Sequence, residues 1–319
     1  MRGLLACKEG LKAFYAKYSA LVMASIRFVM AFAAAFLINQ NVGFLPKLSG
    51  VGVPIIAGLV CAVLPFGAIA FLMGGLLLAQ LSAASVEVAV ITFVFLLIVV
   101  LLYYGFQPGD SILLLATPIL FFLKMPFAIP LLVGLAGSLV SVIPMSCGIF
   151  VYYVILYVKQ NSSFLVGSEQ TEISQVVAQV LKGILANPPM MVMIAACCLG
   201  ALTAFVIKNL SINYSWGIAI GAGLLVQLLA VFVGDFRFDV AMSVPELILN
   251  AALSAGVAAV YHFFVFAVDY TRTEYTQFED DDYYYYVKAV PKIAIPKTDV
   301  RVQKINKVNK KKTQPSRRP

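Results

Sequence analysis

VEVAVITFVFLLIVVLLYY, residues 86–104, contains a single charged side chain, Glu87, in nineteen residues. As an α-helix this stretch rises about 28 Å, which matches the ~30 Å hydrocarbon core of a bilayer. Similar runs recur along the 319 residues, which are 61% hydrophobic and 12% charged, with a mean hydropathy of +0.94. A soluble domain cannot bury that much apolar surface, and the runs lack the alternation of β-barrel strands. The sequence therefore predicts an all-α, polytopic transmembrane helical bundle whose main partner is the lipid bilayer.

The number of membrane spans is predicted as ten, with eight as the alternative. Two regions of about thirty residues, 51–81 and 111–142, are each broken by proline near the middle. Each of these regions is either two short spans or a re-entrant hairpin buried in protein. The apolar segments lie near residues 20–38, 51–64, 65–81, 86–104, 111–123, 126–142, 145–158, 188–207, 214–233 and 246–268.

The less apolar regions divide the chain further. Residues 1–19 carry basic side chains opposite apolar ones at helical spacing, which predicts an amphipathic interfacial helix, with a solvated leader as the alternative. A first membrane block is expected at 20–158, an external loop with an amphipathic helix at 159–187, and a second block of three spans at 188–268. Lys and Arg gather near both chain ends, which favours a cell (plasma or inner) membrane protein with both termini in the cytoplasm.

Residues 51–104 and 110–158 share a pattern at an offset of 61 residues, in which a proline-phenylalanine pair is followed by a patch of small residues. Three spans in each unit would invert the second unit relative to the first, as in many transporters that bind substrate near the midplane. The alternative is chance, because Pro, Gly and Phe are common in membrane helices. The residues predicted to line a transport pathway are Pro54, Pro65, Phe66, Gly74, Gly75, Pro118, Lys124, Pro126, Phe127, Gly134 and Gly137.

The tail, residues 269–319, begins with an acidic and tyrosine-rich stretch and ends with a basic one. The tyrosines predict a β-strand that either docks a cytoplasmic protein partner, such as an ATPase or envelope machinery, or folds on its own protein. Residues 288–319 hold eleven Lys or Arg and one acid, and they predict a disordered segment that contacts anionic lipid headgroups. Because this segment explains the net charge of +8, no nucleic-acid partner is expected. The predicted docking residues are Asp280, Asp281, Asp282, Tyr283, Tyr284, Tyr285 and Tyr286.

Catalytic and metal-binding motifs do not occur in the sequence. It contains no G-x-S-x-G, H-E-x-x-H, Walker A or dinucleotide-binding glycine pattern, and its one histidine, His262, excludes a multi-histidine metal site. We therefore expect no enzyme activity, no catalytic or metal-binding residues and no cofactor. The sequence favours a permease-like transporter of an unidentified small solute, and its composition has a bacterial appearance. The alternative is a non-transporting scaffold or assembly factor that recruits a cytoplasmic partner through the tail.

Overall fold

The computed structural model describes residues 2–162, 173–238, 243–266, 274–279 and 282–290. The chain forms two compact units, one of residues 13–267 and the other of residues 1–12 with 268–319. Asp280, Asp281 and the basic end of the tail lie outside the described residues, so the predictions made for them stay predictions.

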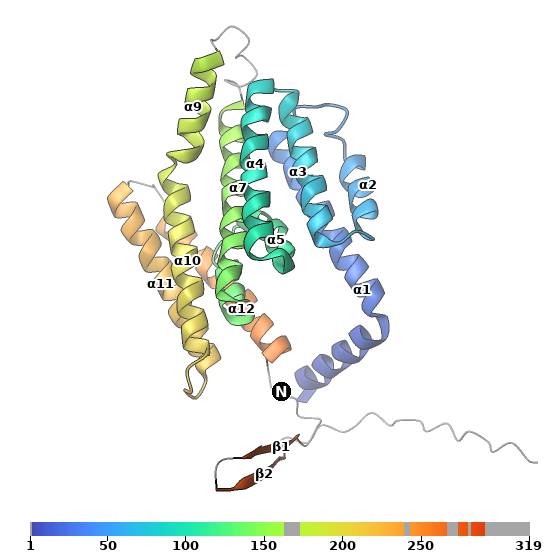
Figure 1. Cartoon of the computed structure of the whole chain (residues 1–319), viewed down its shortest axis with the longest axis vertical. Helices are drawn as coiled ribbons and strands as arrows, with labels where there is room; N and C mark the ends of the chain where they lie inside the picture. The colour runs from blue at the N-terminus through green and yellow to red at the C-terminus, as the bar shows by residue number, and fades with distance from the viewer. Residues whose placement is uncertain (1, 163–172, 239–242, 267–273, 280–281, 291–319) are drawn as a thin grey trace, which may run out of the picture. The chain divides into compact units, whose positions relative to one another are not determined.

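Helices make up the larger unit (Figure 1). Six described helical stretches are long and apolar enough to cross a membrane: Cys7–Val42, Val86–Phe106, Leu139–Gln160, Ser174–Lys208, Ser215–Phe238 and Val244–Val265. The predicted all-α bundle is therefore confirmed, and the chain is a multi-pass membrane protein. The helices are α1 (Arg2–Val42), α2 (Gly52–Cys61), α3 (Phe66–Ser82), α4 (Val86–Phe106), α5 (Ser111–Phe122), α6 (Ala128–Ala136), α7 (Val142–Gln160), α9 (Ile173–Leu185), α10 (Pro188–Lys208), α11 (Ser215–Phe238) and α12 (Val244–Tyr261).

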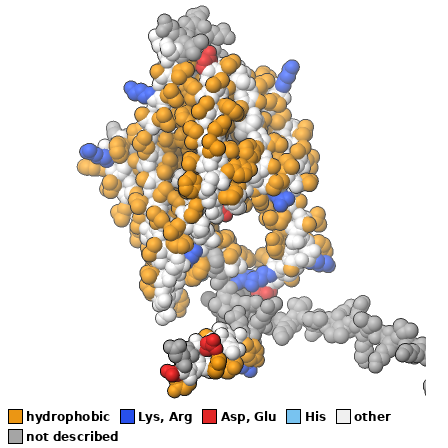
Figure 2. Space-filling model, in the orientation of Figure 1, with side chains coloured by type: hydrophobic (Ala, Val, Ile, Leu, Met, Phe, Trp, Pro, Cys, Tyr) orange, Lys and Arg blue, Asp and Glu red, His pale blue; other side chains and the backbone are white. Residues whose placement is uncertain are grey.

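The outer surface of the bundle is apolar. Figure 2 shows hydrophobic side chains covering its visible face. In the most apolar window of α4 only 22% of the residues are buried inside the protein, so most of this helix is left for lipid to cover. A surface of this kind is unfavourable in water and favourable in hydrocarbon.

Three of the four helices in the proline-broken regions are too short to cross a bilayer alone, and the fourth, α3, has 17 residues that rise about 26 Å. The 10 residues of α2, 12 of α5 and 9 of α6 rise about 15, 18 and 14 Å, against a hydrocarbon core of ~30 Å. Of the two alternatives for these regions, the structure favours hairpins, α2 with α3 and α5 with α6. The ten or eight expected spans thus become six long helices and two hairpins of shorter ones, because the breaks before Phe66 and Ala128 leave α2, α5 and α6 too short for full spans.

A buried glutamine closes the open end of the α2–α3 hairpin. Gln80, which is fully buried near the end of α3, accepts a hydrogen bond from the backbone N–H of Leu45 at 2.8 Å. Its Nε2 donates to Oδ1 of Asn39 at 3.0 Å, and Asn39 Nδ2 donates to the carbonyl of Leu48 at 2.7 Å. The end of α1, the segment before α2 and the end of α3 are thereby fastened together, and we call these four residues the first clasp.

A second clasp, made by Gln107, Asp110, Ser138 and Ser141, closes the α5–α6 hairpin. Ser141 Oγ donates to Asp110 Oδ2, and the same carboxylate oxygen accepts from Gln107 Nε2 at 3.3 Å. The backbone N–H of Ser138 donates to Ser141 Oγ at 3.1 Å, which ties the end of α6 to the start of α5. The 21 residues of α4 between the clasps rise about 31 Å. The two hairpins are therefore closed at opposite ends of the unit.

Glycines allow close contacts between helices. A Cβ added to Gly134 of α6 would lie 2.6 Å from Cβ of Ala204 and 2.8 Å from the carbonyl oxygen of Ala201, both on α10. A Cβ on Gly148 of α7 would lie 2.6 Å from Cβ of Thr117 on α5. Small residues allow this approach where apolar burial from water supplies no driving force between helices.

The amphipathic pattern expected in the external loop forms α9, but its apolar face is covered by protein. Val176, Val180 and Ile184 are buried in a cluster with residues of α4 and α7. The helix is thus packed on the bundle along one face. It leads into α10 at Asn187, whose side chain accepts a hydrogen bond from the N–H of Met190 at 3.3 Å.

Near the start of the chain α1 changes direction at Tyr18, where the backbone leaves helical geometry (φ −122°, ψ 33°). The expected interfacial segment, 1–19, therefore ends at a kink inside one long helix. Phe14, Tyr15 and Tyr18 are exposed beside this kink, and Lys17 lies 5.1 Å from the ring centroid of Tyr18. Aromatic and basic side chains together are typical of the headgroup region.

The smaller unit contains a two-stranded antiparallel sheet of β1 (Glu274–Glu279) and β2 (Tyr284–Ala289). The strand predicted from the tyrosines is confirmed as β2, whereas its partner β1 was not predicted. Phe278 lies opposite Tyr285, and the two rings stack with their centroids 4.8 Å apart. Tyr275 and Phe278 are β-favouring residues that could have predicted β1. The tyrosine-rich stretch that follows has a stronger β-strand pattern, and only that stretch was predicted as a strand.

Gly134→Ala should destabilise the bundle, because the new methyl group collides with the backbone of α10. We expect a loss of about 1–3 kcal/mol, the usual cost of overpacking. Gly221→Ala on α11 is the matched control, since a Cβ there meets no atom within 4 Å. Thermal unfolding in detergent should show a lower melting temperature for Gly134→Ala alone, and equal melting of both variants would contradict the packing described.

Candidate functional site

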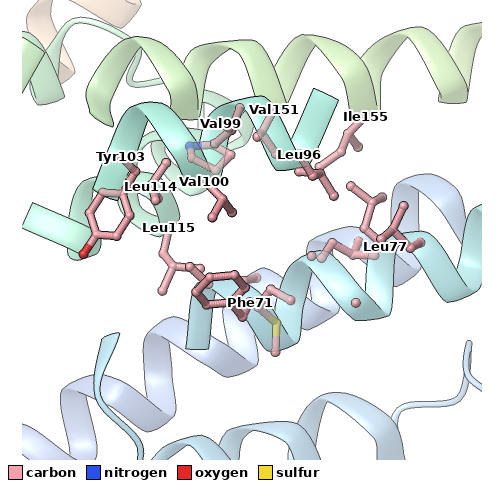
Figure 3. A pocket seen from close by; sticks show the side chains of 18 of the residues that line it. Phe71, Leu77, Leu96, Val99, Val100, Tyr103, Leu114, Leu115, Val151 and Ile155 are labelled. Atoms are coloured by element: carbon pink, nitrogen blue, oxygen red, sulfur yellow. The ribbon is translucent and has the colours of Figure 1, made fainter. Parts of the chain in front are cut away.

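A cavity of about 450 Å³ lies between residues 51–104 and residues 110–158, each of which contains one hairpin and the long helix after it, and which we call the two hairpin units. Its walls come from α1, α3 and α4 on one side of the boundary and from α5 and α7 on the other. In Figure 3, Phe71 of α3, Val100 of α4 and Leu115 of α5 point toward the same space. Its volume lies in the ~300–1,000 Å³ range of small-molecule sites.

Hydrocarbon lines this cavity almost throughout. Among its lining residues the one side chain with a polar group is Tyr103, and its hydroxyl already donates a hydrogen bond to the carbonyl of Pro108. A polar solute would lose its hydration here without replacement hydrogen bonds, which costs several kcal/mol. The cavity therefore suits an apolar molecule or the apolar part of an amphiphile.

One wall of the cavity faces the lipid side of the bundle. Phe71 of α3 is 49% exposed and Phe93 of α4 is 53% exposed, whereas Leu115 on the inner wall is 4% exposed. Part of the cavity wall therefore belongs to the outer surface, which would lie against acyl chains.

Local sequence accounts for the space. Gly74 and Gly75 of α3 present no side chain, and a Cβ on Gly75 would meet nothing within 4 Å. Pro118 in the middle of α5 has no N–H to donate to the carbonyl of Leu114, one turn earlier, so α5 lacks a regular backbone hydrogen bond beside the cavity.

The residues predicted to form a transport pathway are not brought together as one site. Gly74, Gly75 and Pro118 line the cavity. The first-unit prolines lie in other places, with Pro54 buried in α2 and Pro65 at the N-terminal end of α3. The remaining positions do not line it either: Phe66, Lys124, Pro126, Phe127, Gly134 and Gly137.

Lys124 forms the tip of the α5–α6 hairpin. It has a left-handed backbone (φ 60°), its N–H donates to the carbonyl of Phe121 at 3.1 Å, and the N–H of Met125 donates to the carbonyl of Leu120 at 2.9 Å. This bonding ends the helix by the motif that usually carries glycine. Lys124 Nζ lies 2.7 Å from Oε1 of Glu246, in the first turn of α12. The lysine thus joins the first membrane block to the second instead of lining the cavity.

The tyrosines predicted to dock a partner lie on the β-hairpin. Tyr284 and Tyr286 are exposed, and Tyr285 packs on Phe278. Each strand residue shares a face with its cross-strand partner, so Phe278 and Tyr285 lie together with the opposed pair Thr276 and Val287. The hairpin therefore has one mainly apolar face.

Sequence reasoning missed the clasps and most of the cavity. Gln80 carried a usable signal, since an amide in an otherwise apolar helix needs a hydrogen-bonding partner. Glu246, in contrast, pairs with a lysine 122 residues away, and local patterns contain no information about such a contact.

Together these features define a multi-pass membrane protein with two short-helix hairpins and an apolar cavity between them. Comparison with family models, with curated proteins and with solved structures finds no match to the chain. Within the described residues, no group of three or more His, Cys, Asp or Glu side chains is arranged to hold a metal ion.

Lys124→Glu should weaken the attachment of the hairpin tip to α12, because it places two carboxylates side by side. Exposed ion pairs contribute about 0.2–1 kcal/mol, so the melting temperature should fall by a few degrees. The double variant Lys124→Glu with Glu246→Lys should recover most of this loss. Lys47→Glu, in the segment before α2, is the control for a change of net charge, and a double variant no more stable than Lys124→Glu would contradict the pairing.

Proposed function

We propose that the protein is a permease-like transporter of a hydrophobic or amphipathic small molecule, with the cavity as its binding site. The observation that carries the proposal is the position of this cavity, which is walled by helices of both hairpin units and faces the lipid side of the bundle. A binding site at the boundary of two units can open and close when one unit moves against the other.

The arrangement of the hairpins supports transport. In each unit a short helix, a break and a second helix precede a long helix, and the two clasps close the hairpins at opposite ends. This order fits an inverted relation of residues 51–104 to residues 110–158. The helix lengths differ, since α3 has 17 residues and α6 has 9, so any shared ancestry has been modified.

The apolar lining narrows the class of solute. Sugars, amino acids and inorganic ions require polar side chains or freed backbone groups where they bind, and the lining offers a tyrosine hydroxyl that is already engaged. The hydrocarbon part of a molecule that already resides in the bilayer is not hydrated, so it loses no hydration on entering the cavity. We therefore propose a lipid-like substrate instead of a water-soluble one.

The sequence and the helix order support a proposal for the membrane and the orientation of the chain. In Figure 1, α1 enters the larger unit and α12 leaves it at the same end, as expected for an even number of long helices. With Lys and Arg concentrated near both termini, we propose a cell membrane protein whose ends are cytoplasmic. The sequence contains no Walker A motif, so transport would draw on an ion gradient, on the substrate gradient or on a separate ATPase.

A second candidate function is that of a scaffold, and the β-hairpin favours it. Two strands alone are marginally stable in water, and an apolar face with Phe278 and Tyr285 would gain stability from a covering partner. The proposed partner is a cytoplasmic protein of the ATPase or envelope-assembly kind. The basic end of the tail would then hold this region near anionic headgroups.

Val100→Phe should slow transport, because the side chain points into the cavity and the larger ring would occupy part of the space (Figure 3). Val94→Phe is the matched control on α4, since this residue is exposed and does not line the cavity. In liposomes, fluorescent single-chain lipids with anionic, neutral and cationic headgroups would be followed as they cross between leaflets, by quenching from outside.

For at least one of these probes the wild type and Val94→Phe should accelerate crossing over protein-free liposomes, and Val100→Phe should lower the rate toward the protein-free value. Failure of the wild type with all three headgroups would contradict transport and leave the scaffold as the better candidate. Equal rates in the two variants would contradict the assignment of the cavity.

A further inference from the structure

A charged side chain, that of Arg27, lies near one end of the cavity. We infer that the cavity binds the hydrocarbon chain of a single-chain amphiphile whose anionic headgroup, a carboxylate or a phosphate, is held by Arg27. This inference rests on the proposed function and specifies its substrate class. It follows from the position of Arg27, from its bonding and from the charge of its surroundings.

The position of Arg27 is fixed by the geometry of α1. Ala34, Leu37 and Ile38 of this helix line the cavity. Arg27 precedes Ala34 by seven residues, which is close to two helical turns, so both lie on the same face about 10 Å apart along the axis. The arginine therefore continues the cavity-lining stripe of α1 toward the kink at Tyr18.

Contacts with α3 place Arg27 at the same end of the cavity as Tyr103. The guanidinium carbon of Arg27 lies 5.7 Å from the ring centroid of Phe66, the first residue of α3. The next residue, Gly67, lines the cavity, and a Cβ there would lie 3.9 Å from the hydroxyl oxygens of Tyr103 and Tyr104. Arg27 thus stands beside the end of the cavity where the few polar atoms gather.

The bonding of Arg27 is incomplete. Its Nε atom is buried and has no hydrogen-bond partner, and within the described residues the guanidinium forms no ion pair with a carboxylate. An arginine that lies inside a membrane helix and lacks a partner is costly, and such residues usually face a partner that completes them. Its contact with Phe66 supplies a cation–π interaction but leaves the Nε donor unused.

The chemistry of the arginine selects the headgroup. A guanidinium presents its donors in a planar fork that matches carboxylate or phosphate oxygens and stays charged at any physiological pH. No acidic side chain lines the cavity. Arg27 would therefore repel a cationic headgroup, and no carboxylate in the lining would compensate. The cavity volume of about 450 Å³ accommodates one chain better than the two chains of a bilayer phospholipid.

Photoreactive fatty probes test this assignment with the full chain in nanodiscs. Four probes share one diazirine-bearing chain and differ in headgroup: carboxylate, phosphate, alcohol and amine. In the wild type, carboxylate or phosphate should label peptides of α3, α4 and α5 about tenfold more than the alcohol, the gain expected of one charge-assisted interaction. The two anionic probes distinguish a fatty acid from a phosphate lipid as the source.

Arg27→Gln should reduce labelling by the anionic probes to the level of the alcohol, and Arg27→Lys should retain a part of the preference. Labelling by the alcohol should not change in either variant, which also reports that the cavity is intact. Equal labelling by all four probes in the wild type, or an anionic preference that survives Arg27→Gln, would overturn the inference.

Should Arg27→Gln fail to fold, competition in the wild type decides the question. Unlabelled fatty acid should displace the alcohol probe at about tenfold lower concentration than unlabelled fatty amine does, and equal potency would overturn the inference. Transport without headgroup preference would refute this inference and leave the proposed function intact. Anionic labelling without transport would refute the function and leave the ligand assignment.

Discussion

A polypeptide in hydrocarbon must satisfy its backbone hydrogen bonds within the protein, and this constraint shapes the whole larger unit. The two breaks in the short helices show how. At the first break, the N–H of Leu64 donates to the carbonyl of Cys61 at 3.1 Å, and at the second the N–H of Met125 donates to the carbonyl of Leu120 at 2.9 Å. Each chain reversal stays bonded, so hairpins of short helices are tolerated where lipid surrounds the bundle.

The clasps and the cavity are consequences of the same arrangement. The open end of each hairpin is held by buried or partly buried polar side chains, through Gln80 at one end of the larger unit and Asp110 at the other. The short helices do not fill the bundle as long ones would. The space that remains between α3, α4 and α5 is the apolar cavity. Arg27 beside it would confer specificity for an anionic headgroup.

Features of the fold that depend on neighbouring residues could be predicted from the sequence, and contacts between distant residues could not. The long apolar run at residues 86–104 predicts its helix directly, because length and hydropathy suffice in a bilayer. Gly74 and Pro118 were predicted to line a pathway because glycine and proline alter the backbone of membrane helices, and both line the cavity. The clasp of Asn39 with Gln80 could not be predicted, since it depends on how two residues 41 positions apart, on different helices, meet in space. For the same reason the cavity's full lining was beyond prediction.

The most direct test of the account is the sidedness of the two hairpin openings. In a variant without the five native cysteines, Lys47→Cys and Gly109→Cys place single thiols next to the first and the second clasp. An impermeant maleimide would be applied to sealed right-side-out and inside-out vesicles. The account predicts that each thiol reacts in one vesicle orientation and that the two orientations are opposite. Reaction of both thiols from the same side would contradict hairpins that enter the bilayer from opposite faces.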